Sequence, residues 1–241
     1  QRQMCIRDRW RSGYWGVARA NDVINSVAEA EDISAARAAE IVGEAKFIRG
    51  WQHFEMQKMY RTPKYVSEAN FSLDDLEASK VPNTGKIWAN IIQDFADAAA
   101  ALPATQAEVG RATKWAALAY QAKALVYSGD YTSALPILEN IVNNGPYTLV
   151  DKFEDNYLVA TRNNSESIFE IQYAVSSADT NASNAEIGLA HPYIAPWGCC
   201  GFLQAPQDLV DFFQTDANGL PLLDESWKTT HTTNPTGANI G

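Results

Sequence analysis

Apolar side chains recur along the first half of the chain at the spacing of α-helices. Between residues 12 and 28 a single stripe is formed by Val17, Ile24 and Ala28, with Asn21 as its one polar member. A buried amide needs hydrogen-bond partners, so we expect Asn21 to be buried and hydrogen-bonded rather than to contact a ligand. The pattern predicts a first helix over residues 12–28.

Two further helices follow. One is predicted from Ser34, a favourable N-cap residue, to about Tyr60, with a broad apolar face typical of a helix buried on more than one side. After a polar loop at residues 62–82, another is predicted over residues 84–102. The positions expected to face inward are Ile41, Ala45, Phe47, Ile48, Trp51 and Phe54 in the second helix, and Ile87, Ile91, Phe95, Ala98 and Leu102 in the third.

The clearest pattern is a pair of equal apolar stripes separated by Gly129 and Asp130. Both stripes have the spacing 0, 3, 4, 7, 10 and 11, beginning at Trp115 and at Tyr131. Two such helices joined by a short turn must fold back as an antiparallel hairpin to hide both faces, which is the arrangement of a tetratricopeptide repeat. Pro136 predicts a kink or a late start in the second of them.

Beyond residue 145 the helical period is lost. Residues 147–150 are short and compatible with an extended chain, and residues 165–175 alternate as in a half-buried strand. A short helix is predicted over residues 207–214 and a turn over residues 217–220. The fold class expected is therefore mainly α, with tetratricopeptide-like helix hairpins and a loop-rich, partly extended C-terminal portion.

Composition narrows the function classes. The chain has 241 residues, 46% of them hydrophobic, and a formal net charge of −10. An acidic surface repels phosphate backbones, so nucleic acid is not expected as a partner. No run approaches the roughly 18 apolar residues of a membrane span. Residues 1–9 are interpreted as a non-native scar, residues 10–227 as a fragment of one α-rich domain, and residues 228–241 as a truncated loop.

Five short motifs follow one another along the chain: residues 44–51 (EAKFIRGW), 110–117 (GRATKWAA), 125–131 (LVYSGDY), 164–171 (NSESIFEI) and 206–213 (PQDLVDFF), the last followed by the turn at 216–221. In this order they resemble the motifs of the SusD/RagB-like outer-membrane nutrient-binding proteins of Bacteroidetes. The resemblance covers about residues 14–224, and three positions depart from the pattern: Gly50 stands where alanine is usual, and Cys199 and Cys200 stand where glycines are common.

The resemblance implies a cell-surface lipoprotein that captures oligosaccharide or another nutrient and delivers it to a SusC-like TonB-dependent transporter. Its scaffold would be the tetratricopeptide-type helices, its glycan contacts would lie in loops, and it would be neither an enzyme nor dependent on a cofactor. The resemblance also implies a signal peptide and a lipid anchor, which we expect to belong to a longer parent protein and to provide its only contact with the membrane.

Candidate ligand contacts lie in the aromatic segment at residues 191–198. Sugar capture needs flat apolar faces for ring C–H groups and polar groups for hydroxyls, and this segment supplies His191, Tyr193 and Trp197 on a loop. We expect Trp197 to be the main stacking platform, against the alternative that it packs under the loop as an anchor. Tyr14 and Trp15, near the start, are expected in the core together with Trp51, Trp88 and Trp115.

Other chemistries are less well supported. A glycoside hydrolase needs two carboxylates, and the nearest pairs, Asp208 with Asp211 and Asp151 with Glu154, occupy positions typical of helix capping. The three histidines are isolated and no metal-binding motif occurs. A tetratricopeptide adaptor that binds a peptide remains an alternative, but it predicts more repeats than the single clear hairpin.

Overall fold

The computed structural model describes residues 2–171, 206–222 and 224–230. The chain forms two compact units, residues 1–171 and 172–241. The segment at 191–198, which contains His191, Tyr193 and Trp197, and the pair Cys199 and Cys200 lie outside the described residues, so their predicted roles stay predictions. The predicted domain bounds likewise stay a prediction.

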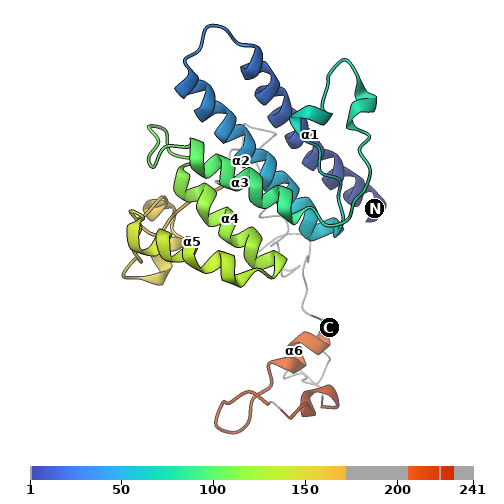
Figure 1. Cartoon of the computed structure of the whole chain (residues 1–241). Helices are drawn as coiled ribbons and strands as arrows, with labels where there is room; N and C mark the ends of the chain where they lie inside the picture. The colour runs from blue at the N-terminus through green and yellow to red at the C-terminus, as the bar shows by residue number, and fades with distance from the viewer. Residues whose placement is uncertain (1, 172–205, 223, 231–241) are drawn as a thin grey trace, which may run out of the picture. The chain divides into compact units, whose positions relative to one another are not determined.

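Five antiparallel helices make up most of the first unit (Figure 1). Each packs mainly against the helix before and the helix after it in the chain. This mainly α architecture of stacked helix pairs confirms the predicted fold class. The helices are α1 (Arg2–Glu29), α2 (Ala35–Tyr60), α3 (Trp88–Ala101), α4 (Lys114–Ser128) and α5 (Tyr131–Asn144); the short 3₁₀ turns are η1 (Glu68–Asn70), η2 (Leu76–Ser79), η3 (Phe153–Asn156) and η4 (Val159–Thr161).

Local chemistry sets the helix ends where the sequence predicts them. Ser34 caps α2 by accepting a hydrogen bond from the Arg37 N–H, and Thr113 and Asp130 cap α4 and α5 in the same way. Gly129 ends α4 with φ +93°, a left-handed conformation that glycine adopts without a steric penalty. The two-residue turn of the α4–α5 hairpin is thereby confirmed.

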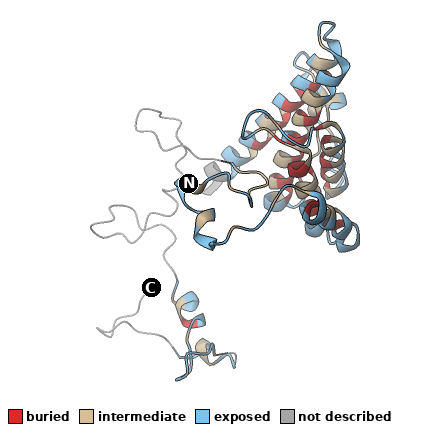
Figure 2. Ribbon diagram, turned by 90° about the vertical axis from the view of Figure 1, so that its left-hand side faces the viewer, coloured by how far each residue is buried: buried red, intermediate tan, exposed pale blue. Residues whose placement is uncertain are grey.

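The core lies between α2, α3 and α4, where buried residues gather in the middle of the stack (Figure 2). Phe54, Ile91 and Phe95 are wholly buried there. Gly50 allows α2 and α3 to approach closely, because an added Cβ would lie 3.1 Å from Asp94 Cβ and 3.2 Å from Phe95 Cε1. Such contacts are tighter than most side chains tolerate, which accounts for glycine at this position.

One helix starts well before its predicted first residue. Helix α1 begins at Arg2 rather than near residue 12, so it includes most of the residues interpreted as a non-native scar. Contacts with α2 extend it: the Tyr60 hydroxyl donates to the Ile6 carbonyl at 2.7 Å, and the Trp10 ring packs on Tyr60 with centroids 4.9 Å apart. Helix α5 begins at Tyr131, directly after its cap Asp130, so of the two effects expected from Pro136 the late start is wrong and the kink stays a prediction.

Several residues expected to face inward are exposed. Trp15 is 57% exposed, and the Arg11 guanidinium lies 5.0 Å from its ring centroid. Ile48 is 48% exposed, whereas its neighbour Phe47, about 100° round the helix, is buried in the core. On α5, Ala134 and Ile141 are buried, but the other four members of the predicted stripe are exposed, Leu135 at 56% among them.

The predicted strand is absent from its described part, residues 165–171. A single backbone hydrogen bond, from the Thr148 N–H to the Ser165 carbonyl at 2.9 Å, joins the two segments expected to be extended, and no ladder continues it. Phe169 instead packs its ring on Phe47, with centroids 5.0 Å apart. Contact with the helical core, rather than strand pairing, holds this segment.

In the second unit, α6 (Gln207–Phe212) confirms the predicted short helix and precedes η6 (Ser226–Lys228). The predicted turn is also present: the Asp216 carboxylate accepts hydrogen bonds from the N–H groups of Asn218 and Leu220, at 2.8 and 2.9 Å. None of the described helices combines the length and apolar character of a membrane-spanning segment.

Candidate functional site

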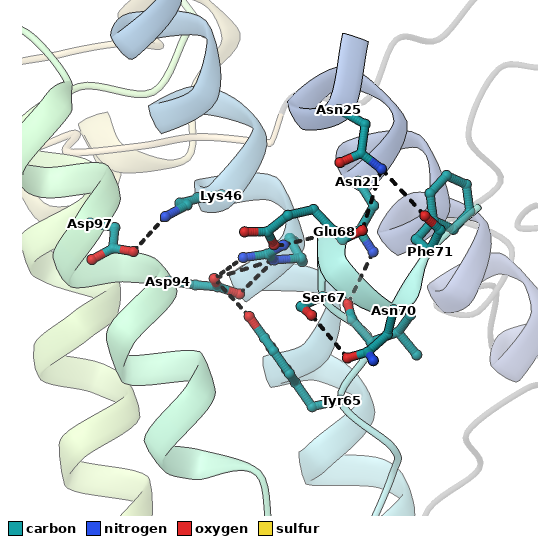
Figure 3. Close-up of polar contacts among 12 residues, drawn as sticks. Asn21, Asn25, Lys46, Tyr65, Ser67, Glu68, Asn70, Phe71, Asp94 and Asp97 are labelled. Atoms are coloured by element: carbon teal, nitrogen blue, oxygen red, sulfur yellow. Dashed lines mark hydrogen bonds and ion pairs between the residues drawn. The ribbon is translucent and has the colours of Figure 1, made fainter. Parts of the chain in front are cut away.

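Polar side chains from α1, α2, α3 and the loop after α2 meet in the interior of the first unit (Figure 3). At the centre, Arg49 of α2 faces Asp94 of α3. Its Nη2 donates to Asp94 Oδ1 at 2.6 Å and its Nε lies 3.1 Å from Oδ2, so the contact is bidentate. Both side chains are only 3% exposed. A charge pair this deeply buried requires partners for its remaining groups.

Those partners come from α1 and from the loop. Arg49 Nη1 donates to Asn21 Oδ1 at 2.8 Å and also pairs with the Glu68 carboxylate. The Tyr65 hydroxyl donates to Asp94 Oδ1 at 2.9 Å. Within the described residues, no buried side-chain nitrogen or oxygen lacks a hydrogen-bond partner.

The same network fixes the path of the loop after α2. Asn21 Nδ2 donates to the Val66 carbonyl at 3.0 Å, which confirms its predicted role as a buried hydrogen-bonding residue. One turn later on α1, Asn25 Nδ2 lies 3.3 Å from the carbonyls of Glu68 and Phe71. Amides on α1 therefore hold residues 66–71 against the helices, although the sequence pattern predicts a surface loop there.

Burial and ion pairing shift the pKa values of Asp94 and Arg49 in opposite directions. Burial raises the pKa of the Asp94 carboxyl, and the hydrogen bonds from Arg49 and Tyr65 counter that rise. Burial would lower the pKa of Arg49, but its hydrogen bonds to Asp94 leave that pKa above its ordinary value. The guanidinium is therefore charged throughout the physiological range.

His53, one turn after Arg49, is wholly buried beside the network. Its Nδ1 lies 3.1 Å from the Arg49 carbonyl, which only accepts, and its Nε2 lies 3.3 Å from the Val66 N–H, which only donates. These partners require the neutral tautomer with the proton on Nδ1. Burial, reinforced by the positive charge of Arg49, lowers the pKa of His53 to about 3.

We expect the protein to lose stability as the pH falls below about 6.5, the ordinary pKa of histidine. Below that pH His53 is protonated in the unfolded chain but stays neutral in the folded chain. The free energy of unfolding therefore falls by about 1.4 kcal/mol per pH unit. Above pH 6.5 His53 is neutral in both states and contributes no slope. Denaturant unfolding at pH 7.5, 6.5 and 5.5 measures this.

A His53→Gln variant provides the control, because glutamine does not titrate. It should be less stable than the parent at pH 7.5 but lose less stability between pH 6.5 and 5.5. Equal slopes in the two proteins over that interval would contradict the assignment of the neutral histidine.

A groove of about 400 Å³ lies between α1 and the loop that the network fixes. We call it the α1 groove and define it by the residues that line it. Its walls are mostly apolar and include three aromatic rings. The lining residues are Trp10, Tyr14, Val17, Ala18, Lys64, Val66, Phe71 and Ser79.

Tyr14 ties the two walls of the α1 groove together. Its hydroxyl donates to the Lys64 carbonyl at 2.7 Å and accepts from the Lys64 N–H at 2.9 Å. Burial raises the pKa of Tyr14 to about 12, so the hydroxyl keeps its proton. The Trp10 ring lies 4.8 Å from the Tyr14 ring, and the two together form an aromatic wall.

A second, more polar cleft of about 220 Å³ lies beside the loop before α4. Its most prominent group is Arg111, which donates to both Glu44 oxygens, at 2.8 and 2.6 Å, and to Glu108 at 3.2 Å. Tyr147 and Phe169 also line it. Arg111 already has carboxylate partners on two sides, so it is less available to a ligand than Lys64.

The carboxylate pairs considered for hydrolysis have other surroundings. Asp211 is 1% exposed and accepts hydrogen bonds from Gln207 Nε2 at 2.9 Å and Gln214 Nε2 at 3.3 Å. Asp151 and Glu154 are exposed. Across the described ranges, no group of three His, Cys, Asp or Glu side chains is placed to hold a metal ion.

Sequence reasoning missed the α1 groove. It placed Tyr14 in the core and left Trp10 unassigned, because the helical period does not show that residues 64–79 fold back alongside α1. One signal could have located it: Asn21 and Asn25 lie one turn apart on α1, and such amides commonly bind backbone carbonyls.

Comparison with known proteins identifies a family. The sequence pattern of a SusD-like family, described as starch-binding and associated with the outer membrane, matches residues 1–126. A SusD-like protein of Bacteroides ovatus is 28% identical over 68% of this chain and 32% of its own length. SusD-like protein P25 of Formosa agariphila is 24% identical over 71% of this chain and 33% of its own.

Solved structures agree with the sequence comparison. A SusD-like carbohydrate-binding protein from Bacteroides fragilis superposes with a TM-score of 0.60 at 25% identity, covering 70% of this chain and 33% of that one. The present chain thus spans about a third of the length of the curated relatives it matches.

Proposed function

The chain belongs to the SusD-like family, and from this premise we propose that it captures oligosaccharide at the cell surface for import, without catalysing a reaction. The family is associated with the outer membrane, and a relative of similar fold is a carbohydrate-binding protein. The observation that carries the proposal is the match over residues 1–126, which contain the aromatic α1 groove.

Delivery to a SusC-like TonB-dependent transporter is the second part of the proposal. The stacked helices of the first unit give a scaffold against which such a transporter could dock. A lipid anchor on the parent protein would hold it at the outer membrane beside that transporter. Oligosaccharide and transporter are the two partners proposed.

We place the main ligand contacts of the protein on the segment at 191–198. Trp197 would stack on a sugar ring, with Tyr193 and His191 beside it, because rings of this kind bind the apolar faces of pyranoses while hydrogen bonds satisfy the hydroxyls. A couple of stacked rings and several hydrogen bonds support a dissociation constant between about 1 μM and 1 mM.

We expect at least one polysaccharide to retard the protein in affinity electrophoresis, and Trp197→Ala to weaken that binding about tenfold, because one stacked ring contributes roughly 1.4 kcal/mol. Trp15→Ala is the matched control, since it removes an exposed tryptophan from α1. It should migrate like the parent, and circular dichroism should show equal helix content in all three.

The outcomes separate function from site. Equal retardation of the parent and Trp197→Ala would keep glycan capture and move the site away from that loop. If no polysaccharide in a broad panel retards the folded protein, glycan capture is wrong, and peptides become the ligands to test.

A further inference from the structure

The α1 groove has the dimensions of a small-molecule site. Its volume of about 400 Å³ falls within the ~300–1,000 Å³ typical of ligand pockets. The loop that forms one wall is fixed by the buried Arg49 network, and the Tyr14 hydroxyl bridges the walls. The groove is therefore preformed, and a ligand would not have to order it.

Few polar groups line the α1 groove, and the charge among them is positive. The Tyr14 hydroxyl is already engaged by the Lys64 backbone, which leaves the Trp10 indole N–H, Lys64 and Ser79 as the lining side chains that can offer polar groups to a ligand. Lys64 is the one charged residue among the eight that line the groove. Of the substituents that a sugar ring can carry, an anionic group is the one that Lys64 would bind most strongly, through a charge-assisted hydrogen bond.

The Lys64 ammonium is available for an anion. None of the ion pairs found in the described part of the chain includes it, whereas nearby Lys80 is paired with Glu77 at 2.6 Å. Both backbone groups of Lys64 bond to Tyr14, so the side chain starts from a fixed point at the groove wall. An anion bound there would not have to displace a carboxylate.

We propose that the α1 groove binds an acidic sugar, a ring that carries a carboxylate or a sulfate ester. The ring's apolar face would contact the aromatic wall of Trp10 and Tyr14 or the opposing Phe71, and its anionic group would pair with Lys64. The inference rests on the proposed glycan capture and adds to it the charge of the ligand and a second contact site, distinct from Trp197.

Isothermal titration calorimetry with charge-matched ligands tests this. One pair is tetragalacturonate and its methyl ester; the other is a sulfated galactan tetrasaccharide and its desulfated form. We expect the intact chain to bind at least one acidic member about tenfold more tightly than its neutral counterpart, as one charge-assisted contact supports. If only the galacturonate pair shows a preference, the anion is a carboxylate; if only the galactan pair does, the anion is a sulfate.

Three variants assign the preference to the groove. Lys64→Met keeps the apolar stem and should bind acidic and neutral members alike, at the parent's affinity for the neutral one. Lys64→Arg retains the charge and should retain the preference. Lys80→Met removes a lysine outside the lining and should behave as the parent.

A parent protein that binds neither acidic member more tightly than its neutral form overturns the inference, and so does a preference that survives in Lys64→Met. Retardation by neutral polysaccharides, abolished by Trp197→Ala, would leave the proposed function standing in either case. Failure to bind any glycan, acidic or neutral, would remove both.

Discussion

Asp94→Ala should lower the free energy of unfolding by about 3–5 kcal/mol. The substitution leaves the Arg49 guanidinium buried at 3% exposure without the carboxylate that contacts it bidentately. Glu68 stays as a partner, but it reaches only Nη1. Urea unfolding followed by circular dichroism at pH 7.5 gives the difference, and retained helix content confirms that the variant still folds.

Asp97→Ala is a matched control on the same helix. Asp97 also pairs with a cation of α2, Lys46, at 2.6 Å, but those side chains are 34% and 21% exposed. Water screens the pair and solvates the partner left behind, so the expected loss is below about 1 kcal/mol. Similar losses in the two variants would mean that burial does not set the importance of the Arg49–Asp94 pair.

Phe47→Ala should cost about 3–5 kcal/mol, because it opens a cavity in the core between α2, α3 and α4. The Phe47 ring is 2% exposed and packs with those of Phe95, Tyr120 and Phe169, at centroid distances of 5.7, 5.5 and 5.0 Å. Thermal and urea unfolding both measure this loss of stability. Part of it comes from the lost contact with Phe169, which holds the segment around that residue against the core.

Ile48→Ala, one residue along α2, should cost less than about 1 kcal/mol, since the side chain is 48% exposed. The pair also tests the orientation of α2, because the apolar pattern predicts both residues inward. A large loss for Ile48→Ala beside a small one for Phe47→Ala would reverse the assigned face of the helix.

The positions and caps of the helices were largely predictable, because they depend on local chemistry. Ser34, Thr113 and Asp130 cap helices through their own side chains, and Gly129 permits a turn that few other residues allow.

Periodicity identified the α3 core, but only half of the predicted α4 stripe is buried, and Ala116, Ala117 and Ala124 are buried outside it. Periodicity failed at Ile48 and Leu135. The apolar face of each of these helices is wider than the surface that the neighbouring helix covers, so some apolar residues stay exposed. The pattern of one helix alone does not show which residues these are.

Long-range contacts in the site were beyond sequence patterns. Asn21 was expected to be buried, but its partners, Arg49 and the Val66 carbonyl, lie 28 and 45 residues away. Pairing of Arg49 with Asp94 likewise crosses 45 residues. Trp10 and Phe71 become neighbours of one groove only because this network folds the loop back. The aromatic segment containing Trp197 was found from composition alone, and its test is experimental.

The order of the helices has a consequence for biosynthesis. Each helix packs mainly on its predecessor, so contacts are local in sequence and folding can follow synthesis from the N-terminus. Arg49, however, leaves the ribosome well before Asp94. Until α3 arrives, the nascent α1–α2 hairpin presents a hydrated guanidinium on the face that will later be core, and a charge on an unfinished face opposes association with the wrong chain.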